Sequence, residues 1–217
     1  LVASSPELLE QGKGDIWDSG KIESDASQWI TYQGKTLKCN APYYWKVKID
    51  TNKGATNWSA PAFWTTGLFN EADWQGQWIG LDRAAPGDSE TQWSRLAARY
   101  LRKEFAVKKD VKRATVHIAG MGLYELFING QRIGNQVLAP APTDYRKTIL
   151  YNTYDVTSLL QTENAIGVTL GNGRFYTMRQ NYKPYKIPTF GYPKLRLNLI
   201  VEYADGSKET IATNTSW

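Results

Sequence analysis

Cysteine and histidine are almost absent from this 217-residue chain. Cys39 and His117 each occur alone, which excludes an intrachain disulfide and a metal site built from cysteine and histidine ligands. His117 lies within the strand-like stretch RATVHIAG, so we interpret it as a packed strand residue. The sequence has no run of about eighteen apolar residues and therefore predicts no membrane-spanning helix.

Familiar catalytic motifs are also missing. The sequence has no G-x-S-x-G elbow, no H-E-x-x-H, no P-loop and no G-x-G-x-x-G after a strand, and residues 171–173 (GNG) indicate a strand-end turn rather than a nucleotide cradle. The formal net charge is +5, but the basic residues are scattered, and their densest group, residues 108–113, is typical of a solvated turn. We therefore expect no nucleic-acid partner.

Aromatic residues are abundant by comparison. The chain is 41% hydrophobic and 13% aromatic, with nine Trp and thirteen Tyr, which is enough to build packed cores. Such residues fill the interior of β-sandwiches, and their faces also suit stacking against a sugar ring. Composition alone does not separate these two uses.

The segment from residue 122 to 173 predicts an antiparallel sheet. Two short apolar and aromatic runs, LYELFI and RIGNQVL, meet at Asn129-Gly130, the strongest short signal for a hairpin. The β-rich runs TILYNTYDV and NAIGVTL follow, separated by a turn in which Asp155 or Thr157 can cap one helical turn. Further on, alternating apolar residues at 195–203 lead into a second hairpin at Asp205-Gly206.

The first 70 residues indicate a separate β-sandwich. YYWKVKI, residues 43–49, alternates in polarity, Asn52-Lys53-Gly54 turns the chain, and WSAPAFWTTG follows. This order resembles the last two strands of a fibronectin type III domain whose first strands are missing. We therefore predict an all-β chain of two tandem β-sandwiches, a truncated fibronectin-III-like domain over 1–70 and a jelly-roll (galactose-binding-like) domain over 71–217. Trp74 and Trp78, in the linker stretch 68–80, are predicted to lie in the contact between the domains.

Several stretches, in this order and spacing, carry a family resemblance: GLYELFINGQRIG, YNTYDVTSLL, ENAIGVTLGNG and FYTMRQNYKPYKIPTFGYPKL. They resemble the N-terminal β-sandwich region of bacterial α-L-rhamnosidases of glycoside hydrolase family 78. Ala141-Pro142 stands where many relatives have Gly-Trp, so no sugar contact of that Trp is carried over.

The resemblance implies a noncatalytic accessory region. Rhamnosidases of this family are inverting hydrolases whose two acids lie in an (α/α)6 barrel, and the sequence contains no such barrel, so we assign no catalytic residue. Both ends of the chain read as interrupted, so we expect a longer polypeptide that releases terminal α-L-rhamnose from glycans or glycosides. Although no signal peptide is visible, we expect a periplasmic or secreted location.

Candidate sugar-binding residues concentrate in one irregular stretch, residues 173–193. It is long, basic and aromatic, and it lacks apolar alternation, which is typical of loops that are functional or disordered. The alternative to sugar binding is that this loop packs on the missing barrel. Arg174, Tyr176 and Arg179 supply guanidinium donors and an aromatic face for a rhamnose-containing ligand. Asn129 and Asp144, at loop positions elsewhere, complete the predicted carbohydrate-binding set.

Two alternatives remain open at this point. The first is a calcium-dependent rhamnose-binding module like those of carbohydrate-binding family 67, with calcium held by oxygens of Asn129, Asp144, Asn152, Asp155 or Asn172. The acidic-plus-amide pair of those binders is not recognisable in this sequence, and Asn129 and Asp155 also suit turn positions. The second is a cell-surface scaffold module that binds no sugar.

Overall fold

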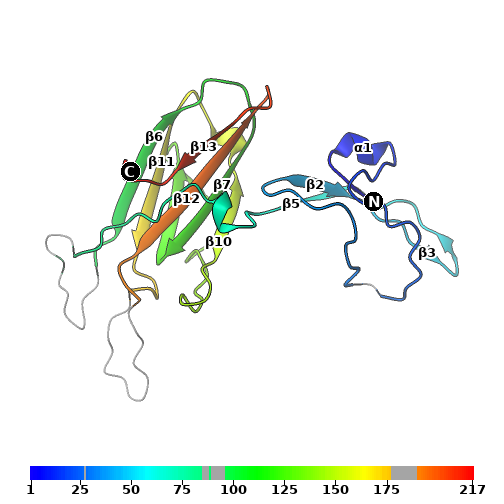
Figure 1. Cartoon of the computed structure of the whole chain (residues 1–217), viewed down its shortest axis with the longest axis horizontal. Helices are drawn as coiled ribbons and strands as arrows, with labels where there is room; N and C mark the ends of the chain where they lie inside the picture. The colour runs from blue at the N-terminus through cyan, green and yellow to red at the C-terminus, as the bar shows by residue number, and fades with distance from the viewer. Residues whose placement is uncertain (27, 85–87, 89–95, 177–189) are drawn as a thin grey trace, which may run out of the picture. The chain divides into compact units, whose positions relative to one another are not determined.

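The computed structural model describes residues 1–26, 28–84, 88, 96–176 and 190–217. The chain divides into two compact units, Leu1–Asp73 and Trp74–Trp217. Antiparallel strands provide nearly all the regular structure of both units, which confirms the predicted all-β fold (Figure 1). Within the described ranges, no helix has the length and apolar character needed to cross a membrane.

The first unit contains a three-stranded sheet of order β1-β2-β5 and a small hairpin of β3 and β4. Its elements are β1 (Val2–Ala3), α1 (Pro6–Glu10), β2 (Pro42–Trp45), β3 (Asp50–Thr51), β4 (Gly54–Ala55), β5 (Ala62–Thr65) and the 3-10 turn η1 (Glu71–Asp73). The turn predicted at Asn52-Lys53-Gly54 is confirmed, and Gly54 adopts a φ of 113° there.

The strand predicted over residues 43–49 is wrong beyond Trp45. Tyr43 is 3% exposed, but Val47 and Ile49 are 44% and 55% exposed, so the alternation does not mark a continuous buried face. The backbone N–H of Val47 donates to Ser59 Oγ, at 3.1 Å, instead of a backbone carbonyl. Regular pairing of β2 with β5 ends at Trp45 and Ala62, although the Ser59 N–H still donates to the Val47 carbonyl at 2.8 Å.

The second unit is a β-sandwich of two four-stranded antiparallel sheets, ordered β10-β7-β12-β13 and β6-β11-β8-β9. Its elements are β6 (Arg99–Ala106), β7 (Val111–Met121), β8 (Leu123–Ile128), β9 (Gln131–Ile133), β10 (Tyr151–Asp155), the 3-10 turn η2 (Thr157–Leu159), β11 (Glu163–Gly171), β12 (Lys194–Tyr203) and β13 (Lys208–Ala212). One apolar core draws residues from both sheets, so the sheets pack face to face (Figure 1).

The predicted alternation in β12 is confirmed. Leu195, Leu197, Leu199 and Val201 are fully buried in the core. Burying each such side chain contributes about 1.5–3 kcal/mol before the entropy of ordering is subtracted. His117, on the neighbouring strand β7, is also fully buried, as its strand position predicts.

Both predicted hairpins of this unit form. Asn129 and Gly130 have φ values of 51° and 81° and join β8 to β9, and Gly206, with φ 84°, lies between β12 and β13. The predicted helical turn forms at Thr157–Leu159, but its N-cap is Val156, which makes no side-chain cap bond; Asp155 Oδ1 instead accepts from the backbone N–H of Thr157 at 2.9 Å, one residue before the cap position. The strand predicted over RIGNQVL ends at Ile133, because Gly134 turns to a φ of 77°.

Residues 76–79, predicted as part of a linker, lie beside β12 within the second unit. Ile79 and Leu195 exchange backbone hydrogen bonds of 2.9 and 2.8 Å, and the N–H of Gln77 donates to the Thr213 carbonyl at 2.7 Å. β13 pairs with residues 198–202 of β12. The 76–79 segment lies along the same edge of β12, nearer its start.

Trp74 packs against side chains of its own unit. Its ring meets Tyr151 edge to face at 5.3 Å, and the Arg196 guanidinium lies 5.1 Å from the ring centroid. The guanidinium Nε of Arg196 also donates to the Gly76 carbonyl at 2.6 Å. These contacts fix the segment to the sheet, and the predicted role of Trp74 and Trp78 between the two units stays a prediction.

Candidate functional site

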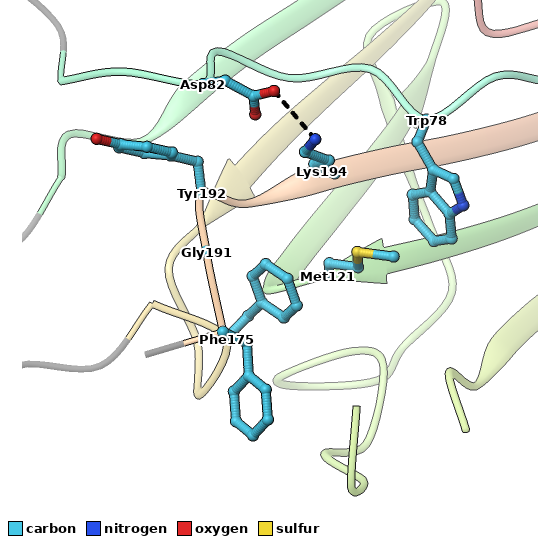
Figure 2. Close-up of a pocket in the computed structure, with 8 residues that line it drawn as sticks. Trp78, Asp82, Met121, Phe175, Gly191, Tyr192 and Lys194 are labelled. Atoms are coloured by element: carbon cyan, nitrogen blue, oxygen red, sulfur yellow. Dashed lines mark hydrogen bonds and ion pairs between the residues drawn. The ribbon is translucent and has the colours of Figure 1, made fainter. Parts of the chain in front are cut away.

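A pocket of about 500 Å³ opens at the end of the second unit where β7 ends and β12 begins. Met121 and Lys194, the last and first residues of these strands, face each other in register. The pocket is lined by Trp78, Asp82, Met121, Phe175, Phe190, Gly191, Tyr192 and Lys194 (Figure 2). We call it the aromatic pocket.

Phe175 and Phe190 form its apolar wall, and Tyr145 packs against both. Phe175 is 7% exposed and stacks on Phe190, with centroids 6.0 Å apart and planes inclined by 23°. Tyr145 meets both rings edge to face, at 5.2 and 5.4 Å. The backbone N–H of Phe190 donates to the Phe175 carbonyl at 2.9 Å, so the two segments that carry the rings are held together.

A second aromatic pair lies beside this wall. Tyr176 stacks on Tyr192 with centroids 5.8 Å apart and an angle of 23° between the planes. Between Phe190 and Tyr192, Gly191 adopts a φ of 137°, which only glycine adopts without strain. This turn places the side chains of Phe190 and Tyr192 on different surfaces of the pocket.

The polar part of the pocket is one ion pair. Lys194 Nζ lies 3.0 Å from Asp82 Oδ2, with the side chains 34% and 63% exposed (Figure 2). Trp78 and Met121 line the opposite side of the opening in that view. Flat apolar faces beside one carboxylate and one ammonium group are suited to a polyhydroxylated ligand that has an apolar face of its own.

Part of the predicted sugar-binding set meets this pocket. Tyr176 contacts the lining residue Tyr192, and Arg174, next to Phe175, is exposed. Arg179 lies outside the described residues. Burial raises the pKa of the Tyr145 phenol, and the nearby charge of Arg174 opposes that rise. The predicted sugar-binding role of these residues stays a prediction.

The other two predicted residues have partners of their own. Asp144 binds Arg146, whose Nε lies 3.0 Å from Oδ1, and this hydrogen bond holds the pKa of the carboxyl below its usual range. Asn129 lies beyond the end of β8 that is remote from Met121. Its amide group donates to Asn164 Oδ1 at 2.9 Å and accepts from the Ala165 N–H at 2.9 Å, which fixes the hairpin to β11.

The candidate calcium ligands are not assembled into a site. Asp155 Oδ1 accepts from the Thr157 N–H at 2.9 Å, Asn152 Oδ1 accepts from the Tyr124 hydroxyl at 2.7 Å, and Asn172 Nδ2 donates to the Leu96 carbonyl at 3.0 Å. Across the described ranges, no three His, Cys, Asp or Glu side chains are grouped to hold a metal ion. The described side chains therefore supply no carboxylate cluster of the kind that calcium, with six to eight oxygen ligands, usually includes.

Several lining residues were not predicted from the sequence. Trp78 was assigned to an inter-domain contact, and Asp82, Met121 and Lys194 carry no local motif. They come together only because the 76–79 segment pairs with β12 and because β12 begins beside the end of β7. The available signal was the pair of aromatic clusters at the two ends of the irregular stretch 173–193.

Family models match both halves of the chain. The model described as "Alpha-L-rhamnosidase N-terminal domain" matches residues 109–217, and "Rha78A-like, N-terminal immunoglobulin domain" matches residues 1–70. The chain belongs to the α-L-rhamnosidase N-terminal domain family. The predicted resemblance is thereby confirmed, and the fibronectin-III-like prediction agrees with an immunoglobulin-type unit, since both are antiparallel sandwiches.

Individual relatives agree with the family. Two proteins of Formosa agariphila, each named alpha-L-rhamnosidase, are 36% and 37% identical over the whole chain. The solved α-L-rhamnosidase of "Dictyoglumus thermophilum" is 40% identical, with a TM-score of 0.87 over 100% of this chain and 24% of its own. The chain spans about a quarter of the length of the two curated relatives, 25% and 24%.

Proposed function

We propose that this chain is the noncatalytic N-terminal region of an α-L-rhamnosidase that releases terminal α-L-rhamnose from glycans or glycosides. The observation that carries the proposal is the family membership of both halves, in a chain that spans a quarter of relatives named alpha-L-rhamnosidase. The catalytic acids would then belong to a different part of the enzyme, and this region would position or extend the substrate site.

The aromatic pocket is the surface that we assign to the substrate. L-rhamnose is a 6-deoxy sugar, so it presents a methyl group and an apolar C–H face together with its hydroxyls. The wall of Phe175 and Phe190 suits the apolar face, while Asp82 and Lys194 offer an acceptor and a donor to hydroxyls. Tyr192, stacked on Tyr176, supplies a further aromatic surface at the rim.

Hydrolysis is not assigned to this pocket. An inverting glycosidase needs two carboxyl groups about 6.5–9.5 Å apart, one as acid and one as base. Among the described lining residues Asp82 is the only carboxylate, and it is paired with Lys194. The geometry therefore supports binding without bond cleavage.

The test is calorimetry of the purified chain with an oligosaccharide that ends in α-L-rhamnose. Tyr192→Ala removes an aromatic surface of the pocket and is expected to weaken binding about two- to tenfold, the scale of one aromatic contact. Phe63→Ala is the matched control, because Phe63 is 68% exposed in the other unit. Equal affinities of all three proteins would contradict a sugar-binding role for the pocket.

The same titration separates the alternatives. Binding that disappears with a calcium chelator would favour a calcium-dependent module, although the described side chains assemble no such site. Absence of binding with any rhamnose-containing ligand would favour a scaffold role.

We also propose a periplasmic or secreted location, which fractionation of the native organism would test.

A further inference from the structure

A second depression, of about 300 Å³, lies on the outer face of the β6-β11-β8-β9 sheet, away from the core. Its floor is Gly167 on β11, which pairs with Arg102 on β6 and with Phe127 on β8. A Cβ atom added at Gly167 would meet no heavy atom closer than Phe127 Cβ, at 3.9 Å. The space above Gly167, between the strands β6 and β8, is therefore open.

Two aromatic side chains lie diagonally across this floor: Phe127 is opposite Gly167, and Tyr100 is opposite Thr169, two residues farther along β11. Tyr100 on β6 is 81% exposed, and Phe127 on β8 lines the other side. Strands that flank a common neighbour lie about 10 Å apart, twice the usual strand spacing. That spacing leaves room for one six-membered sugar ring on the floor of Gly167 and Thr169, within reach of an aromatic side chain.

Charged side chains on the same face of the sheet form the wider rim of the depression and cancel one another, and of these Arg102 lines the depression itself. Arg102 and Glu104 form an ion pair of 2.6 Å, and Arg132 and Glu125 form another of 3.4 Å. All four side chains are between 39% and 70% exposed, so their remaining donors and acceptors can reach a ligand. A rim with two cations and two anions offers hydrogen bonds without favouring a charged ligand.

The shape and charge identify one class of occupant. An anion would meet Glu104 and Glu125, and a cation would meet Arg102 and Arg132. A stable protein partner buries roughly 800 Å² on each side, with an apolar centre, and two aromatic side chains around a glycine supply little of that. A neutral ligand with flat C–H faces and many hydroxyls fits both the walls and the rim.

We propose that the Gly167 depression binds one ring of a neutral saccharide between Tyr100 and Phe127. This second site is separate from the aromatic pocket and does not depend on the function proposed for that pocket. It would let the region hold a glycan chain at a point remote from wherever a terminal residue is bound.

The experiment is an NMR titration of the ¹⁵N-labelled chain with three separate probes. Methyl α-L-rhamnopyranoside and methyl β-D-glucopyranoside are the neutral sugars, and D-galacturonate is the acidic comparison. At sugar concentrations up to about 100 mM, which fill a site of millimolar Kd, at least one neutral sugar is expected to shift the amides of Gly167, Thr169 and Tyr100. Galacturonate is expected to shift them less.

Two substitutions localise the site. Tyr100→Ala is expected to weaken binding about two- to tenfold, the scale of one aromatic contact. Gly167→Val fills the floor and is expected to abolish binding while the melting temperature is kept or raised, since valine favours strands. Val137→Ala, at a residue that is also 81% exposed, is the control and should bind as the unmodified chain does.

The outcomes are distinguishable from those at the aromatic pocket. Tyr192→Ala should leave the Gly167 shifts unchanged, so failure at one site does not imply failure at the other. The proposal is overturned if no neutral sugar moves these amides, if galacturonate binds more tightly, or if Gly167→Val binds normally. If the amide resonance of Gly167 shifts with protein concentration in the absence of sugar, this face is a self-association surface, and the proposal is also overturned.

Discussion

Asp82 Oδ2 holds Lys194 Nζ at 3.0 Å at the rim of the aromatic pocket, between a segment before the first sandwich strand and the start of β12. The pair is largely exposed on the Asp82 side, so its contribution to stability is small, about 0–1 kcal/mol. The pair also engages Asp82, which is the only carboxylate among the described lining residues. Our proposal is therefore that this pocket contacts a ligand without cleaving it.

Asn129 provides a test of whether a predicted sugar ligand is instead a hairpin residue. Asn129→Ala should lower the free energy of unfolding by about 1–2 kcal/mol, because it removes bonds to Asn164 and Ala165 and leaves alanine at positive φ. Asn129→Gly keeps the backbone favourable and should cost less. Urea unfolding measures both, and loss of sugar affinity with unchanged stability would speak against the hairpin role.

His117 predicts a dependence of stability on pH. Burial, with a smaller effect of the Arg113 charge, lowers its pKa from 6.5 to about 4. The unfolded chain therefore binds more protons than the folded chain between these values, so stability should fall as the pH drops below 6.5. The expected loss at pH 5 is about 2 kcal/mol, and His117→Gln should remove that part of the slope. Parallel pH profiles of the two proteins between pH 7 and 5 would refute this assignment.

Gly76 tests how the 76–79 segment is fixed to the sheet. Its N–H donates to Asn198 Oδ1 at 2.8 Å, and a Cβ atom there would lie 2.5 Å from the Leu197 carbonyl oxygen. Gly76→Ala should therefore destabilise the second unit by about 1–3 kcal/mol. Gly167→Ala, where a Cβ has open space, is the control and should be neutral or slightly stabilising. Equal melting temperatures for the two variants would contradict the close packing at Gly76.

Local patterns predicted the sandwich well because their causes are local. Alternation in β12 and the Asn129-Gly130 turn follow from the two-residue period of strands and from positive φ. The same alternation was misleading at Val47 and Ile49, which are exposed and whose backbone N–H groups donate to side-chain hydroxyls. Burial of one face depends on what packs against it, and the pattern does not contain that information.

The aromatic pocket was only half predictable. The irregular stretch gave Tyr176 through its composition, but Trp78 and Met121 reach the pocket by pairing between segments far apart in the chain. The spacing of residues in the sequence does not indicate which distant segments pair. The stacked pair of Tyr176 and Tyr192 likewise brings together two residues on opposite sides of a 15-residue interval.

The most direct test of the central claim is saturation-transfer NMR of 4-nitrophenyl α-L-rhamnopyranoside with the purified 217-residue chain. Saturation of the protein aromatic protons should reach the rhamnose methyl and ring protons, and should weaken in Tyr192→Ala, while no free rhamnose or nitrophenol accumulates. Asp82→Asn should leave the absence of hydrolysis unchanged. Release of rhamnose by the chain that is lost in Asp82→Asn would contradict the account, as would the absence of saturation transfer to the sugar.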